Sequence, residues 1–96
     1  MAKKVSKNIL NYRVIIEKEY YDDGKVVYSA SCPTLSVFDY GDSIDKVLAS
    51  IKDGIEGVIE FLTEKGREIP VDRPDESIVT FTEVKVPPKS EHLIAA

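Results

Sequence analysis

The sequence predicts an α+β domain of the order β-β-β-α-β, in which a three-stranded antiparallel sheet carries one long helix on one face and a fourth strand parallel to the first. Three observations predict this class. Two segments in which apolar and polar residues alternate are joined by Asp-Gly. A long stretch with apolar residues three and four apart follows them, and a β-branched segment comes later. The chain has 96 residues, enough for one core. We expect a single domain over residues 11–87, a flexible basic arm over 1–10 and a tail over 88–96.

The first two strands are expected over residues 11–21 and 25–32, because apolar and polar side chains alternate in both, as in half-buried strands. Asp23 and Gly24 tolerate positive φ, which predicts a two-residue type I′ turn between antiparallel strands. Cys32 shares a face with apolar neighbours. This placement predicts that the thiol packs in the core as a small hydrophobe.

A third, shorter strand is expected over residues 36–40. Pro33 has no N–H to donate and should end the second strand. Leu35 lies in the turn between the two strands. Gly41 then allows a sharp turn out of the third strand.

The long helix is predicted by apolar residues that recur at spacings of three and four from Ile44 to Leu62. Asp42 or Ser43 can cap its start by accepting hydrogen bonds from the free N–H groups of the first turn. Gly66 can end it in the left-handed conformation.

The fourth strand is expected over residues 77–86, where β-branched residues precede Pro87-Pro88. A right-handed crossover through the helix would return this strand parallel to the first, in the spatial order 3-2-1-4. The helix then covers one face of the sheet and leaves the other more open. We therefore expect self-association into a dimer or a larger homo-oligomer.

The composition narrows the function classes. One cysteine cannot form an internal disulfide, and one cysteine with one histidine is too few for a Cys/His zinc site. The formal net charge of −4 disfavours a protein that neutralises many phosphates, and residues 39–76 hold eleven acids against five bases, a net of −6. No signal peptide or membrane-spanning run is recognised. We expect a cytoplasmic protein with a basic partner and no membrane association.

Catalysis is not expected. A cysteine nucleophile needs a base nearby, but the sole histidine, His92, follows a double proline in the predicted tail. Asp39, Asp42 and Asp45 lack the twelve-residue spacing of a calcium-binding loop. The sequence therefore predicts no catalytic residue, no cofactor and no metal ligand.

Between Val14 and about Val71, three short motifs follow one another along the chain. They are Pro33 and Leu35 after the second strand, Gly41, Asp42 and Ser43 before the long helix, and Gly66 with Ile69-Pro70 after it. In this order the segment resembles the HicB-like antitoxin family, whose signature has a strand ending in P-D-L-P-G, then G-D-T before a long helix, and a G-x-x-I-P ending. Here Thr34 replaces the aspartate, Ser36-Val37 replaces Pro-Gly, and Ser43 replaces the threonine.

This resemblance implies a partial ribonuclease-H-like domain that binds a small, basic, mRNA-cleaving toxin of the HicA type and covers its catalytic surface. The antitoxin itself performs no chemistry. Many members carry a further DNA-binding domain at the C-terminus, and the few residues after the fourth strand are too short for a helix-turn-helix. Direct DNA binding is therefore not expected.

The sequence leaves two other function classes open. The first is a ribonuclease-H-like, metal-dependent nuclease remnant with Mg²⁺ held by acids such as Asp39, although two-metal hydrolysis needs several converging carboxylates. The second is a small nucleic-acid-binding regulator, in which basic residues near the N-terminus and strand tyrosines contact a single strand. The residues concerned are Lys3, Lys4, Lys7, Tyr12, Tyr20, Tyr21 and Tyr28.

Two sets of helix residues are candidates for binding. Glu56, Glu60 and Glu64 recur every four residues, where like charges repel by about 0.2–0.5 kcal/mol per pair. They form either an acidic stripe that docks a basic partner or an ordinary solvated face. Gly54 and Gly57 each cost about 1 kcal/mol against alanine in a helix. They form either a self-association contact or a place of tight packing between the helix and the sheet.

Overall fold

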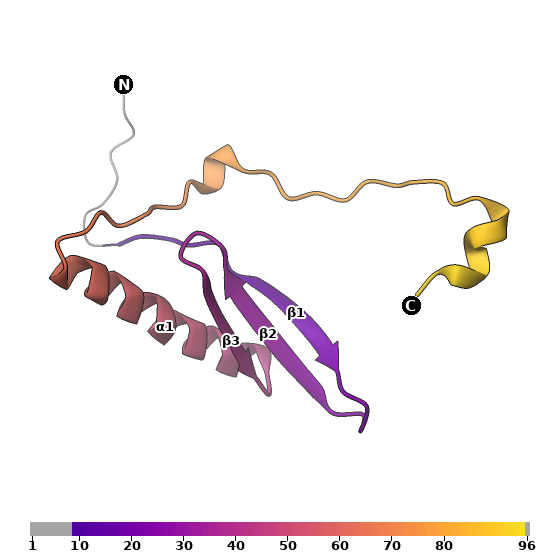
Figure 1. Cartoon of the computed structure of the whole chain (residues 1–96), viewed down its shortest axis with the longest axis horizontal. Helices are drawn as coiled ribbons and strands as arrows, with labels where there is room; N and C mark the ends of the chain where they lie inside the picture. The colour runs from indigo at the N-terminus through magenta and orange to yellow at the C-terminus, as the bar shows by residue number, and fades with distance from the viewer. Residues whose placement is uncertain (1–8, 96) are drawn as a thin grey trace.

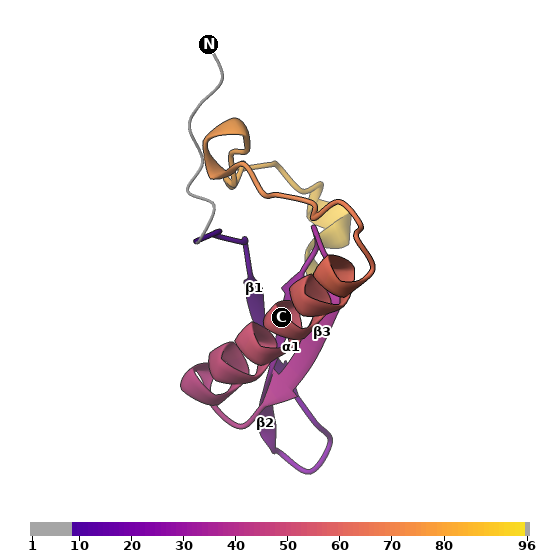
Figure 2. The same cartoon turned by 90° about the vertical axis from the view of Figure 1, so that its left-hand side faces the viewer.

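The computed structural model describes residues 9–95. Three strands form an antiparallel sheet in the order β1-β2-β3, and one long helix lies across one face of it (Figures 1 and 2). This arrangement confirms the expected α+β class. Lys3, Lys4 and Lys7 lie outside the described residues. The elements are β1 (Ile15–Tyr20), β2 (Val26–Cys32), β3 (Val37–Gly41), α1 (Ile44–Glu64), and the 3₁₀ helices η1 (Pro74–Glu76) and η2 (Pro88–Leu93).

The turn between β1 and β2 differs from the predicted two-residue type I′ turn. Tyr21 N–H donates to the carbonyl oxygen of Lys25 at 2.9 Å, and Gly24 N–H donates to the carbonyl oxygen of Tyr21 at 2.9 Å. Only Gly24 in this loop has a positive φ, 85°, whereas type I′ would also require one at Asp23. The loop therefore has three residues. Asp23 stabilises it by accepting a hydrogen bond from the Lys25 N–H at 2.9 Å.

Gly24→Ala is expected to lower the free energy of unfolding by about 1 kcal/mol, because a side chain at positive φ clashes with its own backbone. A Cβ built on Gly24 meets nothing within 4 Å, so the cost is purely conformational. Urea denaturation of the wild type and the variant measures the difference. An unchanged midpoint would contradict the left-handed assignment.

The turn between β2 and β3 runs through residues 33–36. Pro33 directly follows the last residue of β2, as predicted. Leu35 packs against the core. Ser36 has a φ of 54°, unusual for a residue other than glycine, and its N–H donates to the carbonyl oxygen of Pro33 at 3.3 Å.

The core lies between α1 and the sheet. Cys32 and Val47 are fully buried and Ile51 is 1% exposed, with Ala30 and Ile55 completing the cluster. The predicted position of Cys32 in the core is confirmed. The helix packs mainly over β2 and β3. The face of the helix toward β1 is consequently less covered than the rest.

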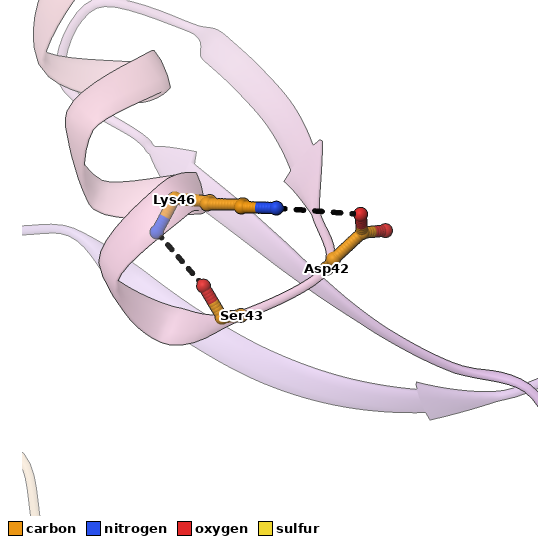
Figure 3. Close-up of polar contacts among 3 residues, drawn as sticks. All are labelled: Asp42, Ser43 and Lys46. Atoms are coloured by element: carbon orange, nitrogen blue, oxygen red, sulfur yellow. Dashed lines mark hydrogen bonds and ion pairs between the residues drawn. The ribbon is translucent and has the colours of Figure 1, made fainter.

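Both ends of α1 use the predicted residues. At the start, the Ser43 Oγ accepts a hydrogen bond from the Lys46 N–H at 3.1 Å, while Asp42 forms an exposed ion pair with the Lys46 ammonium at 3.8 Å (Figure 3). Ser43, rather than Asp42, is therefore the cap. At the other end, Gly66 has a φ of 62°, and the N–H groups of Gly66 and Arg67 donate to carbonyl oxygens of the last turn, which forms a Schellman motif.

Gly41 has a role other than the predicted one. It is the last residue of β3 and its φ is not positive, so no special turn conformation is required. A Cβ at this position would lie 2.9 Å from the backbone nitrogen of Val47. Gly41 is needed because the first turn of α1 passes directly over it.

Residues 77–86, here called the extended segment, are not paired as the predicted fourth strand within the single chain. After η1 the segment is extended and runs away from the sheet (Figure 1). β1 begins at Ile15 instead of Asn11, because its ladder with β2 starts at the pair Ile15 and Ser31 and residues 11–14 run past that end. The predicted tail contains the 3₁₀ helix η2.

None of the helices in residues 9–95 combines the length and the apolar character required to cross a membrane.

Candidate functional site

An apolar groove of about 900 Å³ lies between α1 and the segment that precedes β1. It is present because α1 is centred over β2 and β3, which leaves one side of its apolar face without a strand beneath it. Isoleucines of α1 and apolar residues near the N-terminus form its walls. We call it the acidic-rimmed groove; its lining includes Leu10, Val14, Leu48, Ile51, Ile55, Ile59 and Ile69, together with Lys52, Glu56 and Glu60.

The structure brings two of the three predicted glutamates to this groove. Glu56 and Glu60 lie on its rim, one turn apart on α1, whereas Glu64 is exposed beyond it at the end of the helix. Within residues 9–95, none of the three carboxylates takes part in an ion pair. With Lys52, the three exposed charged residues of the lining carry a net of −1 beside an apolar surface, a combination that suits a basic, partly apolar partner.

A set of hydrogen bonds holds the chain after α1 against the segment before β1. The Tyr12 hydroxyl donates to the carbonyl oxygen of Pro70 at 2.6 Å, and the Arg13 N–H donates to Asp72 Oδ2 at 2.8 Å. The Arg13 guanidinium also donates to Ser77 Oγ at 3.2 Å. The hydrogen bond from the Arg13 backbone lowers the pKa of Asp72, and burial raises the pKa of Tyr12. These contacts position the wall of the groove.

The face of the sheet opposite α1 is the second surface of interest. Phe38 and Tyr40 of β3 are 72% and 60% exposed, and Ile15 of β1 is 40% exposed. Ile15 and Phe38 both pair with Ser31 of β2, so they lie in one row across the sheet. We call this apolar surface the open sheet face. No element within residues 9–95 covers it.

Asp39 lies on the other face of the sheet, toward α1. It accepts a hydrogen bond from the Ser50 hydroxyl and another from the Tyr40 N–H at 2.8 Å. The Ser50 hydroxyl is the main reason why the pKa of Asp39 is lowered. The carboxylate thus ties β3 to α1.

Ser50→Ala is expected to raise the pKa of Asp39 toward the ordinary value of 3.8, because the hydroxyl hydrogen bond favours the ionised form. Since the folded-state pKa is depressed, the associated stability is present above the unfolded pKa and is lost as the pH falls through the folded value. NMR titration of the Asp39 carboxyl carbon measures the shift. A pKa unaffected by the substitution would contradict the assigned cause.

The candidate catalytic residues do not lie together in one site. Cys32 is buried in the core, and His92 lies in η2 at the far end of the described chain. Among residues 9–95, no three His, Cys, Asp or Glu side chains are placed so that they could hold a metal ion. Asp39 is accordingly not joined by the further carboxylates that two-metal hydrolysis requires.

Gly54 and Gly57 lie in different surroundings. A Cβ on Gly54 would be 3.1 Å from the Val37 side chain of β3, so this glycine allows close packing between α1 and the sheet. A Cβ on Gly57 would meet nothing within 4 Å. Of the two, only Gly57 is free to contact another molecule.

The sequence predicted that one face of the sheet is left more open, but it indicated neither the groove nor the contacts of Asp72. The isoleucines of α1 were recognised as apolar, but their periodicity does not say which of them lies beyond the edge of the sheet. Asp72 carried no signal, because its partner, Arg13, is 59 residues away. Neighbouring residues of a strand point to opposite faces of the sheet, so Phe38 lies on the face away from Val37. This alternation is the sign in the sequence that Phe38 is exposed.

Comparison of the chain with models of protein families, with curated proteins and with solved structures finds no match.

Proposed function

We propose that this chain is a HicB-like antitoxin domain, a non-catalytic protein that binds a small, basic, HicA-type toxin in the cytoplasm and blocks the surface with which the toxin cleaves mRNA. The observation that carries the proposal is the acidic-rimmed groove, which joins Glu56 and Glu60 to an apolar floor. The sequence motifs around Pro33, Gly41 and Gly66 provide independent support.

The charge of the chain supports the same assignment. A formal net charge of −4 attracts a basic protein from a distance and repels RNA, the substrate of such a toxin. The apolar floor of the groove can then bury a side chain of the partner, since interfaces combine a desolvated apolar centre with a polar rim. Blocking a toxin by this route requires only a stable surface of complementary shape and charge.

The proposal includes a finer point of fold. We infer that residues 77–86 act as a fourth strand beside β1, in the order 3-2-1-4 of a partial ribonuclease-H-like domain. The hydrogen bond between Arg13 and Ser77 supports this, because it places the beginning of the extended segment next to the beginning of β1. Within residues 9–95, the outer edge of β1 has no partner strand.

Co-expression with the protein encoded in the neighbouring reading frame, which the proposal expects to be small and basic, tests the function. We expect the two proteins to co-purify, and we expect the complex to lack the RNA-cleaving activity of the isolated toxin. The double variant Glu56→Lys/Glu60→Lys should slow association roughly tenfold and weaken its dependence on salt, because rim charges act mainly on the association rate. Surface plasmon resonance at several salt concentrations measures both effects.

The matched control is Asp22→Lys/Glu91→Lys, which changes the net charge equally at exposed positions outside the groove. If both double variants weaken binding equally, general charge and not the groove is responsible. If neither does, the groove is not the toxin site. Magnesium-dependent RNA cleavage by the purified chain, abolished by Asp39→Asn, would support a nuclease instead.

A further inference from the structure

The extended segment, residues 77–86, carries apolar side chains that nothing covers within residues 9–95. Phe81 is 98% exposed, Ile78 89%, Val79 75% and Val84 73%. Soluble chains rarely expose so many large apolar residues in one stretch, and where they do, the stretch contacts another molecule. A single strand also has no stability of its own, since its N–H and C=O groups need a neighbouring strand.

The dimensions of the chain point in the same direction. Its radius of gyration is 18.2 Å, whereas a compact chain of this length has about 12–13 Å. The difference arises because the extended segment and η2 project away from the sheet and the helix (Figure 1). Such a projecting segment is suited to reaching a neighbouring molecule.

The segment has apolar residues on both of its sides. Ile78, Val84 and Val86 alternate with Val79 and Phe81. Within residues 9–95, one copy of the chain leaves these side chains exposed and the outer edge of β1 without a partner strand. Two copies can each supply the strand that the other lacks.

We propose that two copies of this chain exchange their extended segments, so that residues 77–86 of each copy become the fourth strand at the β1 edge of the other. One side of the strand then covers the end of the acidic-rimmed groove nearest β1, while Glu56 and Glu60 stay on the rim along α1. The exchange is reciprocal and closes into a two-fold dimer, which leaves no further free edge at β1.

The contacts at the start of the segment fix where it leaves its own chain. Pro70, Asp72 and Ser77 are hydrogen-bonded to Tyr12 and Arg13 of their own chain, and from there the segment runs away from its own β1. The inference rests on the four-stranded sheet proposed above. It is independent of toxin binding, which is measured separately.

Crosslinking of mixed single-cysteine variants tests the exchange. Glu17→Cys places a thiol on β1 and Thr82→Cys places one on the extended segment, while the native Cys32 is fully buried and should not react with a short bismaleimide. We expect a covalent product of two chains when the two variants are mixed, and its loss when Glu64→Cys, at the end of α1, replaces Glu17→Cys. The flexible reagent tolerates a difference of one or two residues in register.

A chain carrying both Glu17→Cys and Thr82→Cys distinguishes the sources of the strand. Crosslinking within one chain, with no two-chain product from the mixture, overturns the exchange and leaves the four-stranded sheet intact. The absence of any crosslink overturns both.

Analytical ultracentrifugation gives an independent measurement. Phe81→Asp is expected to convert the dimer to a monomer with an unchanged circular dichroism spectrum, whereas the control Phe61→Asp, on exposed α1 surface, leaves the dimer intact. A wild-type chain that is monomeric at high concentration overturns the proposal.

Discussion

Ile51→Ala is expected to lower the free energy of unfolding by about 2–5 kcal/mol, the range for removing a large aliphatic side chain from a packed interior. Ile51 is 1% exposed and lies in the core between α1 and the sheet. A domain of this size has a total stability of only about 5–15 kcal/mol. The variant should therefore melt well below the wild type or fail to fold at room temperature, as thermal and urea denaturation would measure.

Leu48→Ala is the matched control, because Leu48 lies one turn earlier on the same helix but is 42% exposed. Partial burial limits the expected loss to about 1 kcal/mol. Both side chains line the groove, so the difference between the two variants reports on burial against the sheet and not on the groove. Equal losses at the two positions would mean that α1 does not present Ile51 to the sheet in the way described.

Gly41→Ala is expected to destabilise the fold by about 1–3 kcal/mol, the usual cost of forcing an extra methyl group into a packed region. The added Cβ would lie 2.9 Å from the nitrogen and 3.1 Å from the Cα of Val47. These are backbone atoms, and the Val47 N–H is itself bonded to the carbonyl oxygen of Ser43 at 3.0 Å. The first turn of α1 would have to move away from β3, which urea denaturation would register.

Gly57→Ala serves as the control for Gly41→Ala. Its Cβ would meet nothing within 4 Å, so the gain in helix propensity of about 1 kcal/mol is expected to appear as increased stability. The two Gly-to-Ala changes thus have opposite expected signs. A stabilised Gly41→Ala variant would exclude the close approach of α1 and β3. A Gly57→Ala variant that loses self-association would place Gly57 in an interface.

Much of the fold could be predicted from the sequence, because the features concerned are local. Each of these features depends on residues within about one turn or one hairpin of one another. They are the alternation along the strands, the apolar periodicity of α1, the cap by Ser43 at its start and the left-handed Gly66 at its end. Even the wrong turn type at Asp23 and Gly24 differs from the observed loop by a single residue. For the candidate site, the sequence indicated the acids of α1 but not the groove beside them.

By itself, the sequence determined the first three strands and the helix, where α1 begins and ends, and which of its faces is apolar. Only the tertiary structure decided that α1 is centred over β2 and β3, that Gly41 is required for space, and that within residues 9–95 the segment 77–86 leaves the outer edge of β1 without a partner strand. The physical reason is the range of the interactions. Caps, turns and periodicity act between neighbours along the chain. The position of α1 depends instead on packing against other elements, such as Gly54 against Val37, and the course of the chain after α1 depends on contacts between residues about sixty positions apart, such as Arg13 with Asp72 and Ser77.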